Sequence, residues 1–160
     1  MRGMHPIHAR QLRFAAALHD IGKLQIPKSI LEKPCKLTKN EFKIIKTHTT
    51  LGAEMLRSIQ GDIGEIVRLI CLYHHEWHDG THSYWGLRAS ELPEYIHIVS
   101  ICDAYTALIT RRSYKEPWLQ DEALNYIQTK AGTQFEPSLV TTLLSLMKND
   151  DCVPAIFNST

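Results

Sequence analysis

Apolar side chains recur at helical spacing along most of this sequence, and this periodicity constrains the fold more than any other feature. It is visible in residues 11–19, 39–59, 62–75, 94–108, 120–131 and 137–147. No segment alternates apolar and polar residues for long enough to predict a sheet, and no internal repeat is visible. The sequence therefore predicts an all-α fold.

Turn and capping residues set the expected ends of these helices. Gly22 is expected to end the first helix, because glycine is the usual residue just past a helix C-terminus. Thr38 and Glu41 form a capping-box pattern, which predicts a helix beginning near residue 39. Pro93 and Pro137 can each open a helix, because proline is favoured in the first turn.

At 160 residues the chain falls within the usual range for one compact domain. We expect a single helical domain over residues 10–148, an N-terminal flank over 1–9 and a C-terminal tail over 149–160. The long stretch between the histidines at 74–75 and Pro93 lacks periodicity, and loops of that length are usually functional.

Charge and hydropathy exclude some classes of partner. Lysine plus arginine (18) nearly balances aspartate plus glutamate (17), which argues against binding to duplex nucleic acid. No apolar run approaches the roughly 20 residues that span a bilayer, and no signal peptide is visible, so we expect no membrane insertion and a cytoplasmic location. The four cysteines lack CxxC spacing, and Cys71 and Cys102 lie in apolar helical runs as expected of reduced structural thiols.

Histidines and aspartates gather at informative positions. The doublets His19-Asp20 and His74-His75 end two predicted apolar helices, and Asp103 lies inside the most apolar one. A carboxylate in such a helix must be paired, hydrogen-bonded or bound to metal. Each residue alone is compatible with a structural role. Together, mixed imidazole and carboxylate ligands suit iron, manganese or zinc.

The order of these residues resembles a known family. The sequence carries HDIGK at 19–23, then Lys46 and His48 followed by Gly52, then HHE-x-x-DG at 74–80, then Asp103 ahead of YxAL. In this order, over nearly the whole chain, these motifs resemble the HD-GYP branch of the HD-domain phosphohydrolases.

The resemblance implies a single HD-type helical domain that hydrolyses cyclic dinucleotides, chiefly cyclic di-GMP, through a metal-bridging hydroxide. It implies two divalent metal ions, iron or manganese rather than zinc, and assigns roles by motif position. The implied metal ligands are His19, Asp20, His48, His74, His75 and Asp103. The implied catalytic residues are Asp20 and Lys23, and the implied substrate-binding residues are Lys23, Tyr84, Arg111, Arg112 and Lys115. A diguanylate-cyclase-type signalling partner and a homodimer are also compatible with the family.

The sequence departs from the family pattern in three places. Where the family has Gly-Tyr-Pro, an ungapped alignment gives residues 82–84, His-Ser-Tyr, although a shift of one residue would give Tyr84 the tyrosine role. The family places a further ligand helix before HDIGK, whereas we interpret His5 and His8 as surface histidines. Thr106 stands where the family commonly has a second aspartate. Two alternatives therefore stay open: a non-catalytic domain that binds a nucleotide or a partner, and a phosphohydrolase that acts on another nucleotide.

Overall fold

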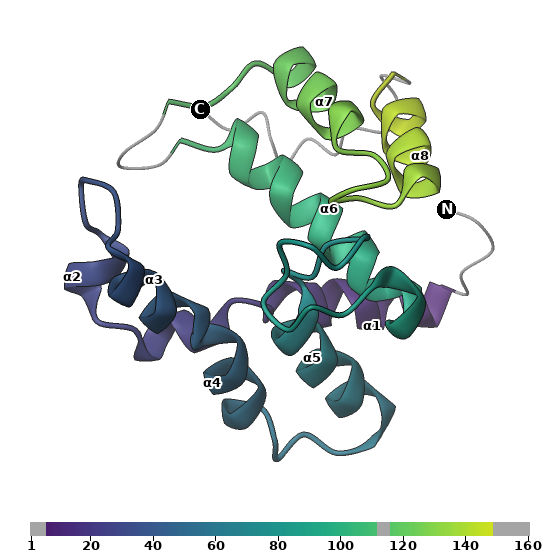
Figure 1. Cartoon of the computed structure of the whole chain (residues 1–160). Coiled ribbons are helices and arrows are strands. Elements are labelled where there is room, and N and C mark those ends of the chain that lie inside the picture. Colours follow the sequence, from purple (N-terminus) through teal and green to yellow (C-terminus); the bar gives the residue numbers. More distant parts are fainter. Residues whose placement is uncertain (1–5, 112–115, 149–160) are drawn as a thin grey trace.

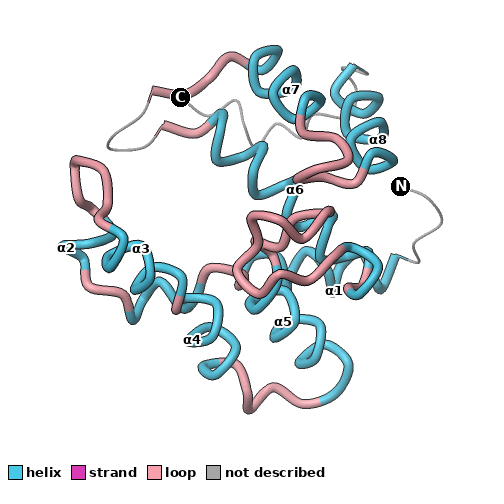
Figure 2. The backbone as a smooth tube through the Cα atoms, viewed as in Figure 1, coloured by secondary structure: helices cyan, strands magenta, loops and turns pink. Residues whose placement is uncertain are grey.

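The structure is a computed structural model that describes residues 6–111 and 116–148. These residues form helices and no β-strand, so the predicted all-α class is confirmed (Figures 1 and 2). No helix within these two ranges is long and apolar enough to cross a membrane. The elements in chain order are α1 (Pro6–Ala17), the 3-10 helix η1 (Ile21–Gln25), α2 (Lys28–Leu31), α3 (Lys39–Lys46), α4 (His48–Met55), α5 (Gly61–Tyr73), the 3-10 helix η2 (Ala89–Glu91), α6 (Glu94–Ile109), α7 (Gln120–Thr129) and α8 (Pro137–Lys148).

Several helix ends follow the local signals in the sequence. The Glu41 backbone N–H donates to Thr38 Oγ1 at 3.2 Å, and the Thr38 N–H donates to Glu41 Oε2 at 2.7 Å, which completes the predicted capping box of α3. Pro93 directly precedes α6, and Pro137 is the first residue of α8. These boundaries therefore arise from short-range chemistry.

Gly22 does not have the role predicted for it. Helix α1 already ends at Ala17, and Gly22 lies inside η1 without a positive φ. A Cβ at this position would lie 2.0 Å from the backbone oxygen of His48 and 2.5 Å from the backbone nitrogen of Gly52. Glycine is required here because η1 and α4 pass each other at backbone distance.

Two hydrophobic clusters form the core, and α6 contributes to both. The first combines buried residues of α1, α5 and the first half of α6: Ala15, Val67, Ile70, Cys71, Ile96 and Val99. The second combines later residues of α6 with α7, α8 and the turn between them: Ile101, Tyr105, Ala123, Leu124, Ile127, Phe135 and Val140. In Figure 1, α6 crosses the molecule between α7–α8 on one side and α1–α5 on the other. Cys71 is buried as expected, whereas Cys102 is exposed.

Candidate metal centre

The side chains of the candidate site come from the ends of three helices and the middle of a fourth. His19 and Asp20 lie in the turn between α1 and η1, His48 is the first residue of α4, and His74 and His75 follow α5 directly. Asp103 lies within α6. Because these helix ends lie close together, residues far apart in the sequence converge on one small volume.

The close passage of η1 against α4 at Gly22 helps to bring the first two motifs together. Because no side chain separates the two backbones there, Asp20 comes within reach of the α4 N-terminus. Asp20 Oδ1 lies 3.3 Å from His48 Nε2 and 3.8 Å from His74 Nε2. The glycine of HDIGK thus serves the site as well as the packing.

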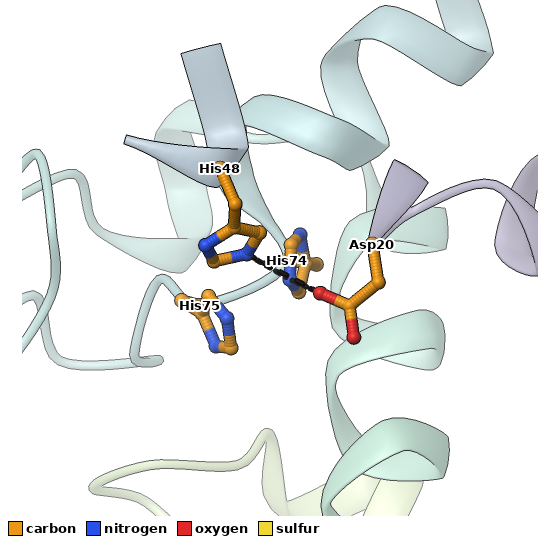
Figure 3. A group of neighbouring side chains, drawn as sticks. All are labelled: Asp20, His48, His74 and His75. Carbon is orange, nitrogen blue, oxygen red and sulfur yellow. Dashed lines mark hydrogen bonds and ion pairs between the residues drawn. The ribbon is translucent and has the colours of Figure 1, made fainter. Parts of the chain in front are cut away.

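The six predicted ligands form two groups that share Asp20. One group consists of Asp20, His48, His74 and His75, and the other consists of His19, Asp20 and Asp103. In each group one ligand atom per residue lies within 4.8 Å of all the others, as a single ion would require. Figure 3 shows the side chains of the first group turned toward a common point. The structure therefore brings together all six residues that the sequence selected.

Backbone carbonyl oxygens orient three of the imidazoles. Because a carbonyl oxygen can only accept a hydrogen bond, Nδ1 of each ring must carry the proton. Nε2 of each ring then faces the shared volume, which is the usual arrangement behind a metal-bound histidine. The three bonds run from His19 Nδ1 to Ala16 O (2.6 Å), from His48 Nδ1 to Ile45 O (2.6 Å) and from His74 Nδ1 to Ile70 O (2.9 Å).

Unsatisfied buried atoms show that a metal ion fits this site. His19 Nε2 and Asp20 Oδ1 are buried and make no hydrogen bond, although each lies at ion-pair distance from other members of the cluster. The Nε2 atoms of His48 and His74 face each other at 3.5 Å, and neither carries a proton when both rings are neutral. Buried polar atoms without partners are costly, and a cation placed among these lone pairs would satisfy them.

Burial keeps three of the four histidines of the cluster neutral. It lowers the pKa of His74 to about 4 and that of His75 to about 3, and it also lowers the pKa of His48. His19 is different. Burial lowers its pKa as well, but its contacts with Asp103 and Asp20 outweigh burial and raise the pKa to about 10. Without metal, His19 is therefore an imidazolium at neutral pH.

Asp20 is ionised and lies beside a lysine. Burial opposes its ionisation, but contacts with His19 and Lys23 hold the pKa of its carboxyl well below the usual range. Lys23 Nζ donates to Asp20 Oδ2 at 2.5 Å, and its side chain is 37% exposed. The Lys23 ammonium therefore lies at the open edge of the cluster, beside Asp20, the carboxylate that the two ligand groups share.

The sequence did not single out Glu76 for a role, yet this residue holds the loop over the site. Glu76 is fully buried, and its carboxylate accepts hydrogen bonds from the backbone N–H groups of Tyr84 (2.8 Å), Trp85 (2.9 Å) and Leu87 (2.9 Å). These bonds hold the loop in place so that the centroids of the Tyr84 and His75 rings lie 4.8 Å apart. The signal for Glu76 was its place in the HHE motif, directly after two candidate ligands.

The remaining predicted residues are exposed or lie outside the described residues. Arg111 is 79% exposed at its side chain and pairs with Glu116 at 3.4 Å. Arg112 and Lys115 lie outside the described residues, as does His5, whereas His8 is exposed on α1.

Comparison with known proteins agrees with the motifs. The family model described as HD domain matches residues 2–139. The chain is 39% identical over 142 residues to the cyclic di-GMP phosphodiesterase response regulator RpfG of Xanthomonas campestris pv. campestris, covering 89% of this chain and 38% of that protein. It is 40% identical over 146 residues to a cyclic di-GMP phosphodiesterase of Thermotoga maritima, covering 91% of this chain and 40% of that protein. A 3'3'-cGAMP-specific phosphodiesterase 2 of Vibrio cholerae is 35% identical over 89% of this chain and 27% of its own length.

The chain thus spans 40% or less of the length of these curated relatives. Among solved structures, Bd1817, an HDG"Y"P protein from Bdellovibrio bacteriovorus, matches with a TM-score of 0.71 at 21% identity, over 91% of this chain and 46% of that chain. That likeness concerns the fold. Taken with the family match over residues 2–139, it shows that the chain belongs to the HD-domain family, with the HD-GYP-type helical fold that its motifs predicted.

Proposed function

We propose that this chain is a metal-dependent phosphodiesterase domain that hydrolyses cyclic dinucleotides, with cyclic di-GMP as the principal substrate. The observation that carries the proposal is the pair of adjacent ligand groups sharing Asp20, because a site that would hold two neighbouring metal ions is a recurrent arrangement for phosphoester hydrolysis. The names of the relatives, which are phosphodiesterases of cyclic di-GMP and 3'3'-cGAMP, support this choice of substrate class.

His48, His74 and His75 with Asp20 would hold one divalent ion, and His19 and Asp103 with Asp20 would hold the other. Mixed imidazole and carboxylate ligands suit iron, manganese or zinc, and among these the resemblance to the HD-GYP branch favours iron or manganese. When bound, such ions lower the pKa of water and stabilise charge on the phosphoryl oxygens.

The side chains around the ligands would bind and orient the substrate. Lys23 places a positive charge beside Asp20, where it can meet a non-bridging phosphate oxygen. Burial raises the pKa of Tyr84 to about 12, so its phenol stays protonated and can donate a hydrogen bond. Arg111, Arg112 and Lys115 are further candidates for binding the phosphates.

The test combines metal analysis with product analysis. The purified chain, loaded anaerobically with iron or manganese, should hold two ions and convert cyclic di-GMP or cyclic GMP-AMP to linear products detected by chromatography. Lys23→Met should keep both ions and lower kcat, because Lys23 is not a ligand. A doubly loaded protein that leaves both cyclic dinucleotides intact would contradict the proposal and favour the non-catalytic alternative. Phosphate release from mononucleotides alone would favour a different substrate.

A further inference from the structure

Lys46 carries an ammonium group in an unusual position. It is the last residue of α3, two residues before His48, and it is half-buried. Its Nζ lies 4.3 Å from the centre of the Tyr84 ring and 5.4 Å from the centre of the Phe42 ring. Two aromatic rings therefore lie close to this cation, and one of them, that of Tyr84, also lies beside the candidate ligand His75.

No carboxylate within the described residues neutralises Lys46. Two other partly buried lysines have one: Lys23 pairs with Asp20 at 2.5 Å, and Lys33 pairs with Glu41 at 2.7 Å. Contact with aromatic rings compensates part of the cost of desolvating an ammonium, at about 0.5–2 kcal/mol. It leaves the hydrogen-bond donors of the ammonium available to an anion.

The position of Lys46 relative to the metal centre limits what that anion can be. The Tyr84 ring contacts Lys46 on one side and lies 4.8 Å from the ring of the candidate ligand His75. The ammonium therefore lies beside the Tyr84 ring, which in turn lies beside the ligand cluster. Lys46 is placed to contact a second anionic group of a molecule whose first phosphate is held at the cluster.

Phe42 borders the same place. Its ring is edge-on to that of Tyr84, with centroids 6.4 Å apart, and it is 46% exposed. An exposed ring beside a cation offers a nucleobase a surface for stacking, worth about 1–3 kcal/mol per base in other proteins. Phe42 and Lys46 therefore present the two kinds of contact that a nucleotide needs.

We propose that Lys46 and Phe42 form a subsite for the half of the substrate that is not being cleaved, in which Lys46 binds its phosphate and Phe42 stacks against its base. The inference rests on the proposed function, since it assumes a substrate with two phosphates. It makes Lys46 a residue that distinguishes dinucleotides from ligands with a single phosphate.

The test measures binding to the manganese-loaded chain by calorimetry, with the linear dinucleotide pGpG and with inorganic phosphate as ligands. Lys46→Met keeps an unbranched side chain on the Tyr84 ring and removes the charge. It should weaken pGpG binding about tenfold, as expected when one charge-assisted hydrogen bond is lost, and change phosphate binding less than about twofold. Lys46→Arg should restore most of the pGpG affinity.

The matched control is Lys43→Met, which removes the same charge from an exposed position on the same helix. It should change neither affinity by more than about twofold, because screening weakens the effect of distant exposed charges. Equal weakening of both ligands in Lys46→Met, unchanged pGpG affinity, or no pGpG binding to the wild-type chain would overturn the inference. Selective loss of pGpG binding in a chain that never cleaves cyclic di-GMP would contradict the proposed function and support the subsite.

Discussion

Metal loading of this protein should release about one proton from its side chains at pH 7, because a histidine must lose its extra proton to bind a metal ion. Of the six candidate ligands, only His19 holds such a proton in the metal-free protein. Its pKa is raised to about 10, so nearly every molecule carries the imidazolium at pH 7. The pKa values of His74 and His75, at about 4 and about 3, make both rings neutral already.

The two carboxylates contribute no proton, because the pKa of Asp20 and that of Asp103 are both lowered and both groups are ionised at pH 7. Isothermal titration calorimetry with Mn²⁺ in several buffers measures this release. The number of protons is the slope of the observed binding enthalpy against the ionisation enthalpy of the buffer. The side chains should contribute about one to this slope, in addition to any proton lost by water bound to the metal ions, and this contribution should appear as the group of three ligands that contains His19 fills.

Two variants isolate the contribution of His19 to this release. His19→Gln should lower the slope by about one, because the only protonated ligand is gone. His82→Gln removes an exposed imidazole of the long loop and should leave the slope unchanged. A slope near zero in the wild-type chain, or the same slope in the wild-type chain and in His19→Gln, would refute the assignment of protonation states.

Three further predictions concern single residues. Gly22→Ala should destabilise the fold by about 3 kcal/mol or more and reduce metal content, because its Cβ would meet the His48 backbone oxygen at 2.0 Å; thermal unfolding and metal analysis measure both effects. Glu76→Gln should keep the metal but cost about 1–3 kcal/mol, because an amide cannot accept all three backbone N–H bonds; the unfolding free energy in urea measures this cost. Asp103→Asn should lower the metal content from two ions per chain to one, because only the group of three ligands contains Asp103; metal analysis after dialysis measures the loss.

The chain supplies controls for these variants. Gly52→Ala adds the same methyl group on the α4 side of this passage, where the nearest atoms would be Cys71 Sγ and the Gly22 backbone nitrogen, both at 3.3 Å, so it should be much less disruptive than Gly22→Ala. Unaltered stability in Gly22→Ala would show that η1 and α4 can separate without loss. Complete loss of metal in Asp103→Asn would show that the two groups do not load independently, and wild-type stability in Glu76→Gln would show that the loop does not depend on that carboxylate.

The sequence predicted what depends on neighbouring residues. The capping box at Thr38 and the proline starts of α6 and α8 involve atoms only a few residues apart, and they are confirmed. The all-α class follows from periodicity, which is also a local property. The ordered motifs then selected six side chains that the structure brings within ligand distance of one another in two groups.

Features that depend on tertiary contacts could not be predicted in this way. In the sequence, Gly22 matches the pattern of a helix terminator. Only the structure shows that glycine is needed because the backbone of α4 passes directly beside it. The role of Glu76 depends on where the next eleven residues fold back. The alignment also left the position of Tyr84 open, whereas the structure places its ring beside His75.

The shared carboxylate has a thermodynamic consequence for metal occupancy. Because Asp20 belongs to both ligand groups, its charge and orientation cannot change for one group without changing for the other. Binding of an ion to the group of four changes the affinity of the group of three by some factor. Binding to the group of three must change the affinity of the group of four by the same factor, because the coupling free energy between two binding sites is reciprocal. Lys23, which also holds Asp20, is part of the same equilibrium. A substitution that weakens one ligand group should therefore also change the affinity of the other group for its ion.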